Sequence, residues 1–242
     1  MNEVLLIGAI AGVAFAYALV GHGGASGYLA LMGLAHVAPE TMKPAALIMN
    51  SCVSLVGFVN YRREGHFRWD LFWPFAVLSV PFAFIGAGIT LDRELYLRLL
   101  GACVVVAALR MFGLFAGRGP TARPVPLAAA LPIGGAIGTL AGALGIGGGI
   151  LLSPVLLLCG WADAKTTAAT SALFILVNSA AGLVRVQGLG HAFSGQLLLW
   201  TAVAIAGGLL GSWVGAHRTP EPRLRQALGA VLLLASVKLI WP

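Results

Sequence analysis

Charged residues are scarce in this chain of 242 residues. They make up only 10% of the sequence, whereas hydrophobic residues make up 59%. A soluble domain carries about 25% charged residues, so this chain has too few polar side chains to cover a water-exposed surface. The same apolar content excludes a disordered chain. These shortages predict a multi-pass membrane protein that has the lipid bilayer as its partner and has no sizeable soluble domain.

Cysteine and acidic residues are scarce as well. Cys52, Cys103 and Cys159 lie far apart within apolar runs and form no CxxC or histidine-linked cluster, so neither a metal site nor a disulfide framework is indicated. The net charge is +7, but the basic residues lie mostly in short loops, as the positive-inside rule predicts. We therefore expect no nucleic-acid partner. No GxxxxGK[ST] motif for ATP occurs, and we expect no cofactor.

The apolar segments predict an all-α polytopic membrane protein, because their residues do not alternate as they do in a transmembrane β-barrel. The N-terminus carries no basic residue, so the first segment is expected to be a helix rather than a cleaved signal peptide. The segments cover residues 4–20, 27–38, 43–61, 70–90, 96–115, 126–144, 149–160, 166–185, 194–215 and 224–241.

A polar linker near the midpoint separates two similar halves. The Gly/Pro-rich stretch 117–125 divides a first membrane repeat, residues 1–116, from a second, residues 126–242. Gly21-His22-Gly23-Gly24 returns as Gly145-Ile146-Gly147-Gly148, and several Ser, Gly and His positions match at nearly the same offset. The common order predicts two homologous halves.

Loop charge predicts how the halves are oriented. The segment 27–38 would reach only about 18 Å as a helix, too little to cross a core of about 30 Å. We therefore expect each half to be a broken or re-entrant hairpin followed by three transmembrane helices. Three crossings per half invert the second half, and this arrangement places 10 Lys and Arg on one side against 5 on the other. A parallel arrangement gives a tie, so inverted repeats are favoured.

The two glycine clusters are the leading candidates for a site. A chain break inside a bilayer is tolerated only where it lines a cavity or is buried in protein. The helix that follows each cluster begins with unpaired N–H groups, which suit an anion. The alternative is close helix packing through small residues. The candidate substrate-binding residues here are Gly21, His22, Gly23, Gly24, Ser26, Gly145, Gly147, Gly148 and Gly149.

Polar residues follow both clusters along the chain. Their hydroxyl and amide groups are able to donate to an oxyanion, and the alternative is interhelical hydrogen bonding. The candidates are Asn50, Ser54, Thr170, Ser171 and Asn178. His22 stands where the second half has Ile146, and an ionisable residue at membrane depth is a functional hypothesis in its own right. It either donates to the anion or carries a coupled proton.

Two other functions stay open at this stage. Gly24-Ala25-Ser26-Gly27 fits GxSG, the nucleophile turn of rhomboid-type intramembrane serine proteases, with Ser26 as nucleophile. Its base would be His66 or His191, and both are expected at loop edges. A permease for a cation or another small solute is the second alternative. All eight acidic residues lie outside the apolar segments or at their ends, which disfavours a cation site.

The chain resembles the TauE/SafE family of sulfite-exporter-type permeases over nearly its whole length. The resemblance is carried by the run from Gly145 to Pro154, which reads GIGGGILLSP, and by the later Ala169-Thr170-Ser171-Ala172 run. The first half departs from the usual GxGGGxLxxP pattern, because Ala30 replaces the proline. The resemblance implies a secondary transporter, not an enzyme, for small sulfur-containing anions in the bacterial inner membrane. The oligomeric state stays open, with a homodimer as one candidate.

Overall fold

The computed structural model describes residues 3–37, 39–89, 125–186 and 195–220, with four single positions beyond them. Within these ranges the regular structure is helical and no strand occurs. The predicted segment 96–115 lies outside the described residues, as does nearly all of 224–241. The helices are α1 (Glu3–Ala18), α2 (Ala25–Leu34), α3 (Pro39–Arg63), α4 (Trp69–Ala87), α6 (Leu127–Leu144), α7 (Gly149–Leu158), α8 (Ala164–Arg185), α10 (Gly195–Trp213) and the π-helix η1 (Val214–Arg218).

Five of the described helices are long and apolar enough to cross a membrane: α3, α4, α6, α8 and α10. Large apolar side chains point outward from them, for example Val77, Leu198 and Leu210, which are 53–68% exposed. Such a surface suits hydrocarbon rather than water. The prediction of an all-α polytopic membrane protein is therefore confirmed.

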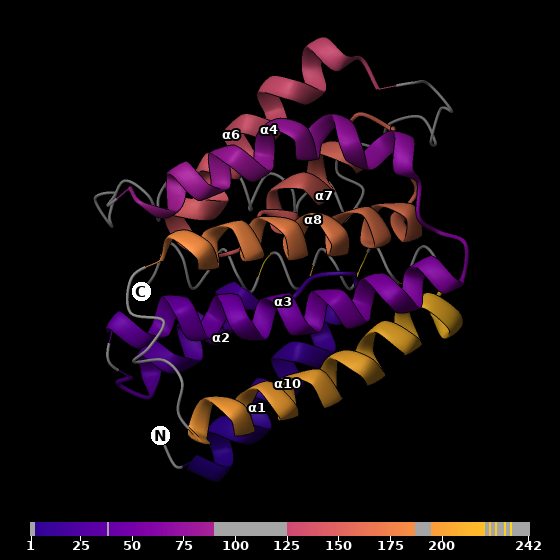
Figure 1. Ribbon diagram of the computed structural model, residues 1–242. Coiled ribbons are helices and arrows are strands. Elements are labelled where there is room, and N and C mark those ends of the chain that lie inside the picture. The colour runs from indigo at the N-terminus through magenta and orange to yellow at the C-terminus, as the bar shows by residue number, and fades with distance from the viewer. Residues whose placement is uncertain are drawn as a thin grey trace.

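The long helices pack in three layers (Figure 1). Helices α3 and α8 lie side by side through the middle, α4 and α6 cover one side of them, and α1 and α10 cover the other. The half-length helices α2 and α7 are tucked against this central pair. Fully buried apolar side chains such as Met49, Val53 and Phe174 fill the space between the layers.

Glycines spaced four residues apart let the outer helix pairs approach closely. On α6, a Cβ at Gly134, Gly138 or Gly142 would overlap the carbonyl oxygens of Phe75, Ser79 and Ala83 on α4. On α10 and η1, a Cβ at Gly207, Gly211 or Gly215 would overlap those of Ala11, Phe15 and Leu19, on and just after α1. This is the small-residue packing that holds membrane helices together. The matched registers show that α6 runs parallel to α4, and α10 parallel to α1.

Polar contacts define the two ends of the helix bundle. At one end, here called the Lys43 end, the Lys43 ammonium donates to the carbonyl oxygens of Ala87 on α4 and Ala143 on α6, both at 3.2 Å. At the other, the Lys165 end, the Lys165 ammonium donates to the Ala216 carbonyl of η1 at 2.9 Å. Helix α3 starts at the Lys43 end and α8 at the Lys165 end.

Helices at matching places in the two halves therefore run in opposite directions. Helix α4 ends at the Lys43 end, where Arg185 at the end of α8 also lies against Gly88. Helix α10 continues into η1 at the Lys165 end. Opposite directions are what inverted halves require. The duplication itself, the linker and the two repeat boundaries stay predictions.

Candidate functional site

Each glycine cluster forms a sharp turn between a long helix and a half-length helix. The first elbow, residues 19–24, joins α1 to α2, and the second elbow, residues 145–148, joins α6 to α7. Gly24 (φ 95°) caps α2 and Gly148 (φ 79°) caps α7 in the left-handed region. Only glycine adopts these angles without strain, which is why the helices break here. Helix α2 leads back to the start of α3, and α7 leads back to the start of α8, so both are hairpins.

The two elbows lie against each other. The Nε2 atom of His22, in the first elbow, lies 3.2 Å from the carbonyl oxygen of Gly149 and 2.8 Å from the hydroxyl of Ser153, both on α7. Ser153 in turn shares a hydrogen bond of 2.8 Å with Ser171 on α8. All three polar side chains are fully buried. A short hydrogen-bonded chain therefore joins α7 and α8 to the elbow of the other half.

Asn50, at the middle of α3, bridges the same region. Its amide nitrogen donates to the Ser179 hydroxyl of α8 at 2.9 Å, and its amide oxygen accepts from the Ala25 N–H, at the start of α2, at 3.2 Å. A Cβ at Gly23 or at Gly147 would overlap this amide, so both elbows need glycine where they contact α3. Asn50 thus holds the first N–H group of α2 and fixes α3 against α8.

Several buried polar atoms at the site have no hydrogen-bond partner among the described residues. They include His22 Nδ1 and Ser54 Oγ, from residues at most 2% exposed. The predicted site residue Thr170, on α8, also has a buried hydroxyl with no partner among the described residues. A buried polar group without a partner costs about 1–3 kcal/mol, so such atoms call for an explanation. Ser54 lies beside the first elbow, where a Cβ at Gly23 would meet its hydroxyl. These atoms are available to a bound polar solute.

The space left at the elbows is small in this conformation. A cavity of about 10 Å³ is lined by both elbows and by neighbouring side chains from α1, α2, α3, α7 and α8. This is room for about one water molecule. The structure therefore shows the region between the elbows closed, and any larger solute requires the helices to separate. Its lining residues are Tyr17, His22, Gly23, Gly24, Ala25, Ser26, Asn50, Ile146, Ile150 and Ile175.

Two of the predicted site residues make other contacts. Asn178 accepts from the Ser79 hydroxyl of α4 at 2.9 Å and donates to the Phe174 carbonyl at 3.0 Å, so its amide links α8 to α4. Ser26 shares a hydrogen bond of 2.9 Å with the Tyr17 hydroxyl. A substrate role for either residue stays a prediction.

Three residues at the elbows were absent from the predicted set: Ser153, Ser179 and Tyr17. Ser153 belongs to the quoted GIGGGILLSP run, and Ser179 is the second-half match of Ser54, so the sequence did contain a signal for both. Nothing in the sequence singles out Tyr17.

A larger cavity lies elsewhere in the described chain. It has a volume of about 650 Å³ and an aromatic lining with one basic side chain, in the angle between α3, α4 and α8. Its lining residues are Phe58, Arg62, Phe67, Trp69, Phe72, Leu173 and Val177. We favour the elbows as the site, because the unpartnered atoms His22 Nδ1 and Ser54 Oγ lie there and the larger cavity is mostly apolar.

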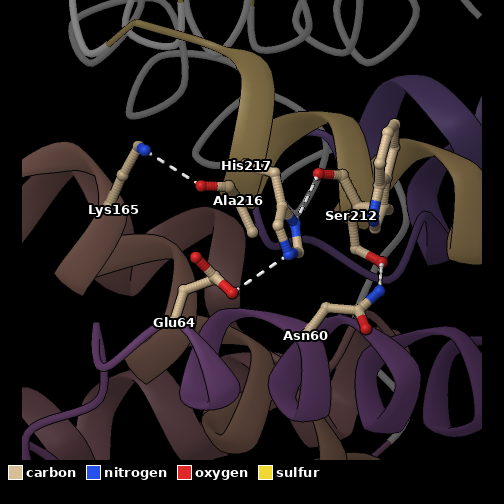
Figure 2. A network of polar contacts seen from close by, with 7 residues as sticks. Asn60, Glu64, Lys165, Ser212, Ala216 and His217 are labelled. Carbon is tan, nitrogen blue, oxygen red and sulfur yellow. Dashed lines mark hydrogen bonds and ion pairs between the residues drawn. The ribbon is translucent and has the colours of Figure 1, made fainter.

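A polar cluster holds the Lys165 end together (Figure 2). The Glu64 carboxylate lies 3.0 Å from Nε2 of His217, whose Nδ1 lies 3.0 Å from the Trp213 carbonyl. Asn60 donates to the Ser212 hydroxyl at 2.8 Å. These contacts tie the end of α3 to α10 and η1. In the adjacent α3–α4 loop, partial burial, together with the nearby positive charge of Lys165, lowers the pKa of His66 below its ordinary value.

Comparison with known proteins agrees with this architecture. Residues 4–239 match the family described as "Sulfite exporter TauE/SafE". The chain is also 36% identical over 233 residues to the "Probable membrane transporter protein y4hK" of Sinorhizobium fredii, covering 95% of this chain and 94% of that protein. No solved structure matches the chain.

Proposed function

Because the chain belongs to the TauE/SafE family, we propose that it is a secondary transporter that exports small sulfur-containing anions. Sulfite, thiosulfate and organosulfonates are the substrate class, and the bacterial inner membrane is the location. An anion that leaves a cell with a negative interior gains about 2.3 kcal/mol per charge for each 100 mV. Export therefore needs no ATP.

One observation carries the proposal: the start of α2, the start of α7 and several unpartnered buried polar atoms converge at the elbows. Helix N-termini offer N–H groups and a positive dipole end to an anion, with no need for a basic side chain. The His22 imidazole and the Ser54 hydroxyl lie at the elbows, and each has a buried polar atom with no hydrogen-bond partner among the described residues. Sulfonate or sulfite oxygens would accept hydrogen bonds from these groups, and Thr170 and Ser171 would complete the set.

The closed cavity supports alternating access. A space of about 10 Å³ holds no oxyanion of sulfur, so binding requires the two hairpins to move apart. Opposite helix directions in the two halves offer two equivalent ways of opening, one toward each side of the membrane. The substrate would then pass the elbows without a continuous channel.

The test is anion efflux from proteoliposomes that contain the purified protein. Gly148→Leu changes a position with φ 79° that is packed against Ile137 and Phe174, and Ser171→Ala removes a hydroxyl of the buried chain. Both variants should lose efflux. Gly65→Leu, also at a positive φ but with open space around it, is the matched control and should keep it. Unchanged efflux in both elbow variants would remove the proposed site.

The protease hypothesis finds less support. Among the described residues Ser26 contacts the Tyr17 hydroxyl, whereas a serine nucleophile needs a base within hydrogen-bond reach. The candidate base His191 lies outside the described residues. The histidine of the first elbow instead contacts Ser153. A serine-reactive fluorophosphonate should therefore leave Ser26 unlabelled, and labelling at Ser26 would reinstate the enzyme.

A further inference from the structure

The hydrogen-bonding pattern of His22 indicates where its proton lies. Its Nε2 atom faces the Ser153 hydroxyl at 2.8 Å, which is able to donate or accept, and the Gly149 carbonyl oxygen at 3.2 Å, which only accepts. A hydrogen on Nε2 suits both contacts, whereas a bare Nε2 would face the lone pairs of the carbonyl oxygen, so we assign the hydrogen to Nε2. In a neutral imidazole only one ring nitrogen carries hydrogen, so Nδ1 is then a bare lone pair. That atom is buried and has no partner among the described residues.

A bare lone pair repels an oxyanion. The other groups proposed for the site, backbone N–H groups and hydroxyls, are donors. Nδ1 is the exception, because its lone pair only accepts. When a proton lies between Nδ1 and the bound anion, Nδ1 becomes a charge-assisted donor. Such a proton comes either with the ligand or from water, and both routes give the same complex. The proton lies on a line between imidazole and oxyanion.

No other described group at the elbows is suited to this task. The residues that line the small cavity include no Asp, Glu, Lys or Arg. The titratable neighbours are the hydroxyls of Tyr17 on α1, which is bonded to Ser26, and of Tyr28 on α2, which packs against Gly24. The stem of Lys43 packs against Gly145 of the second elbow, but its ammonium donates to the carbonyl oxygens of Ala87 and Ala143. From α7 and α8 the facing groups are the hydroxyls of Ser153 and Ser171, and from α3 the amide of Asn50. His22 is therefore the one side chain of this set whose ordinary pKa lies near neutral pH.

We propose that each transported anion moves together with one proton, which His22 Nδ1 shares with it. The proposal rests on the proposed function and adds the coupling ion to it. Protons and charges balance simply: one proton and one anion enter the site from one side, and both leave on the other, with Nδ1 returning to a lone pair. A monovalent sulfonate then crosses without net charge and is driven by its own concentration gradient, whereas divalent thiosulfate carries one net negative charge and is also driven outward by the negative interior.

The test measures protons and anion together in proteoliposomes. A pH-sensitive dye is trapped inside, the membrane potential is clamped with potassium and valinomycin, and a gradient of thiosulfate or methanesulfonate is imposed. Neither probe titrates where histidine does. The wild type should move one proton with each anion, and clamping at different potentials should change thiosulfate flux but not methanesulfonate flux. Anion flux without proton movement would overturn the inference and leave the proposed function standing. Absence of flux for every sulfur anion would overturn the proposed function.

The variant His22→Gln tests whether His22 holds the transported proton. His22→Gln keeps an N–H donor for the Gly149 carbonyl but does not take up a proton. It should transport more slowly, without proton movement, and methanesulfonate flux should become dependent on potential. His66→Gln makes the same change in the α3–α4 loop and should retain coupling. Proton movement that persists at the wild-type ratio in His22→Gln would overturn the assignment.

Binding provides a second readout that does not depend on turnover. At pH values where free His22 is neutral, uptake of one proton on binding makes the apparent anion affinity fall tenfold for each unit rise in pH. Thermal stabilisation of the wild type by thiosulfate should follow this slope, and that of His22→Gln should be flat. A flat wild-type profile would contradict the proposal.

Discussion

Replacing Asn50 by alanine is the most informative change to the packing around the elbows. Asn50 is 1% exposed and makes two hydrogen bonds, to Ser179 of α8 and to the Ala25 N–H of α2. An interhelical hydrogen bond in a membrane protein contributes about 0.6 kcal/mol, and an orphaned buried donor costs about 1–3 kcal/mol. Asn50→Ala should therefore lower the free energy of unfolding by about 2–3 kcal/mol.

Asn60→Ala is the matched control, because it changes the same residue type on the same helix. Asn60 makes one bond, to Ser212 at the Lys165 end, and is only partly buried. Its loss should cost about 0.6 kcal/mol. Unfolding in mixed micelles by titration with dodecyl sulfate measures both values. Equal destabilisation of the two variants would refute the claim that Asn50 holds the elbows.

Transport measurements on Asn50→Ala and Asn60→Ala separate a loss of stability from a loss of function. Per folded molecule, Asn50→Ala should slow anion efflux by about tenfold or more, equivalent to about 1.4 kcal/mol, because the start of α2 is no longer fixed. Asn60→Ala should stay within about twofold of the wild type, since ~0.4 kcal/mol separates rates by that factor. If both variants lose efflux in proportion to stability, the elbows have no special role.

Three further predictions concern the helix contacts and the ends of the bundle. Gly138→Ala forces a Cβ into the Ser79 carbonyl and should lower the free energy of unfolding by about 2 kcal/mol or more. Gly12→Ala, at a position with open space, should raise it by up to about 1 kcal/mol. Unfolding in mixed micelles measures both values, and equal effects would refute the close α4–α6 contact. Glu64→Gln removes one partner of a half-exposed pair and should cost less than about 1 kcal/mol, with the difference vanishing in high salt; a loss that salt does not change would contradict a mainly ionic contact. Lys43→Met removes the donor shared by the carbonyl oxygens of Ala87 and Ala143 and should make proteolysis at the Lys43 end faster than it is in Lys165→Met. Equal cleavage at the Lys43 end in the two variants would argue that Lys43 does not hold α4 and α6 there.

Part of this architecture was predictable from the sequence. The glycine clusters predicted the elbows, since few other features break an apolar helix inside a membrane. The short second segment predicted the hairpin, and α2 and α7 indeed have 10 residues each. Asn50 and Ser54, which the sequence offers as candidates, both lie against Gly23 of the first elbow.

The remaining features depend on how helices pair. Helical spacing states which residues share a face but not which neighbour that face meets, so the sequence does not show that Asn178 contacts Ser79 of α4. For the same reason Ser153 was not selected, because its partner His22 lies 131 residues away. The four-residue glycine spacing predicts close approach but does not identify α4 and α1 as the partners.

The central claim is that a sulfur oxyanion binds between the two elbows. Selenite, the selenium analogue of sulfite, locates that position directly by its anomalous scattering in crystals of the protein. The account predicts a selenium peak next to the first residues of α2 and α7, with the selenite oxygens within hydrogen-bond distance of His22 Nδ1 and Ser54 Oγ. A peak confined to the aromatic cavity beside Arg62, with none at the elbows, would contradict it.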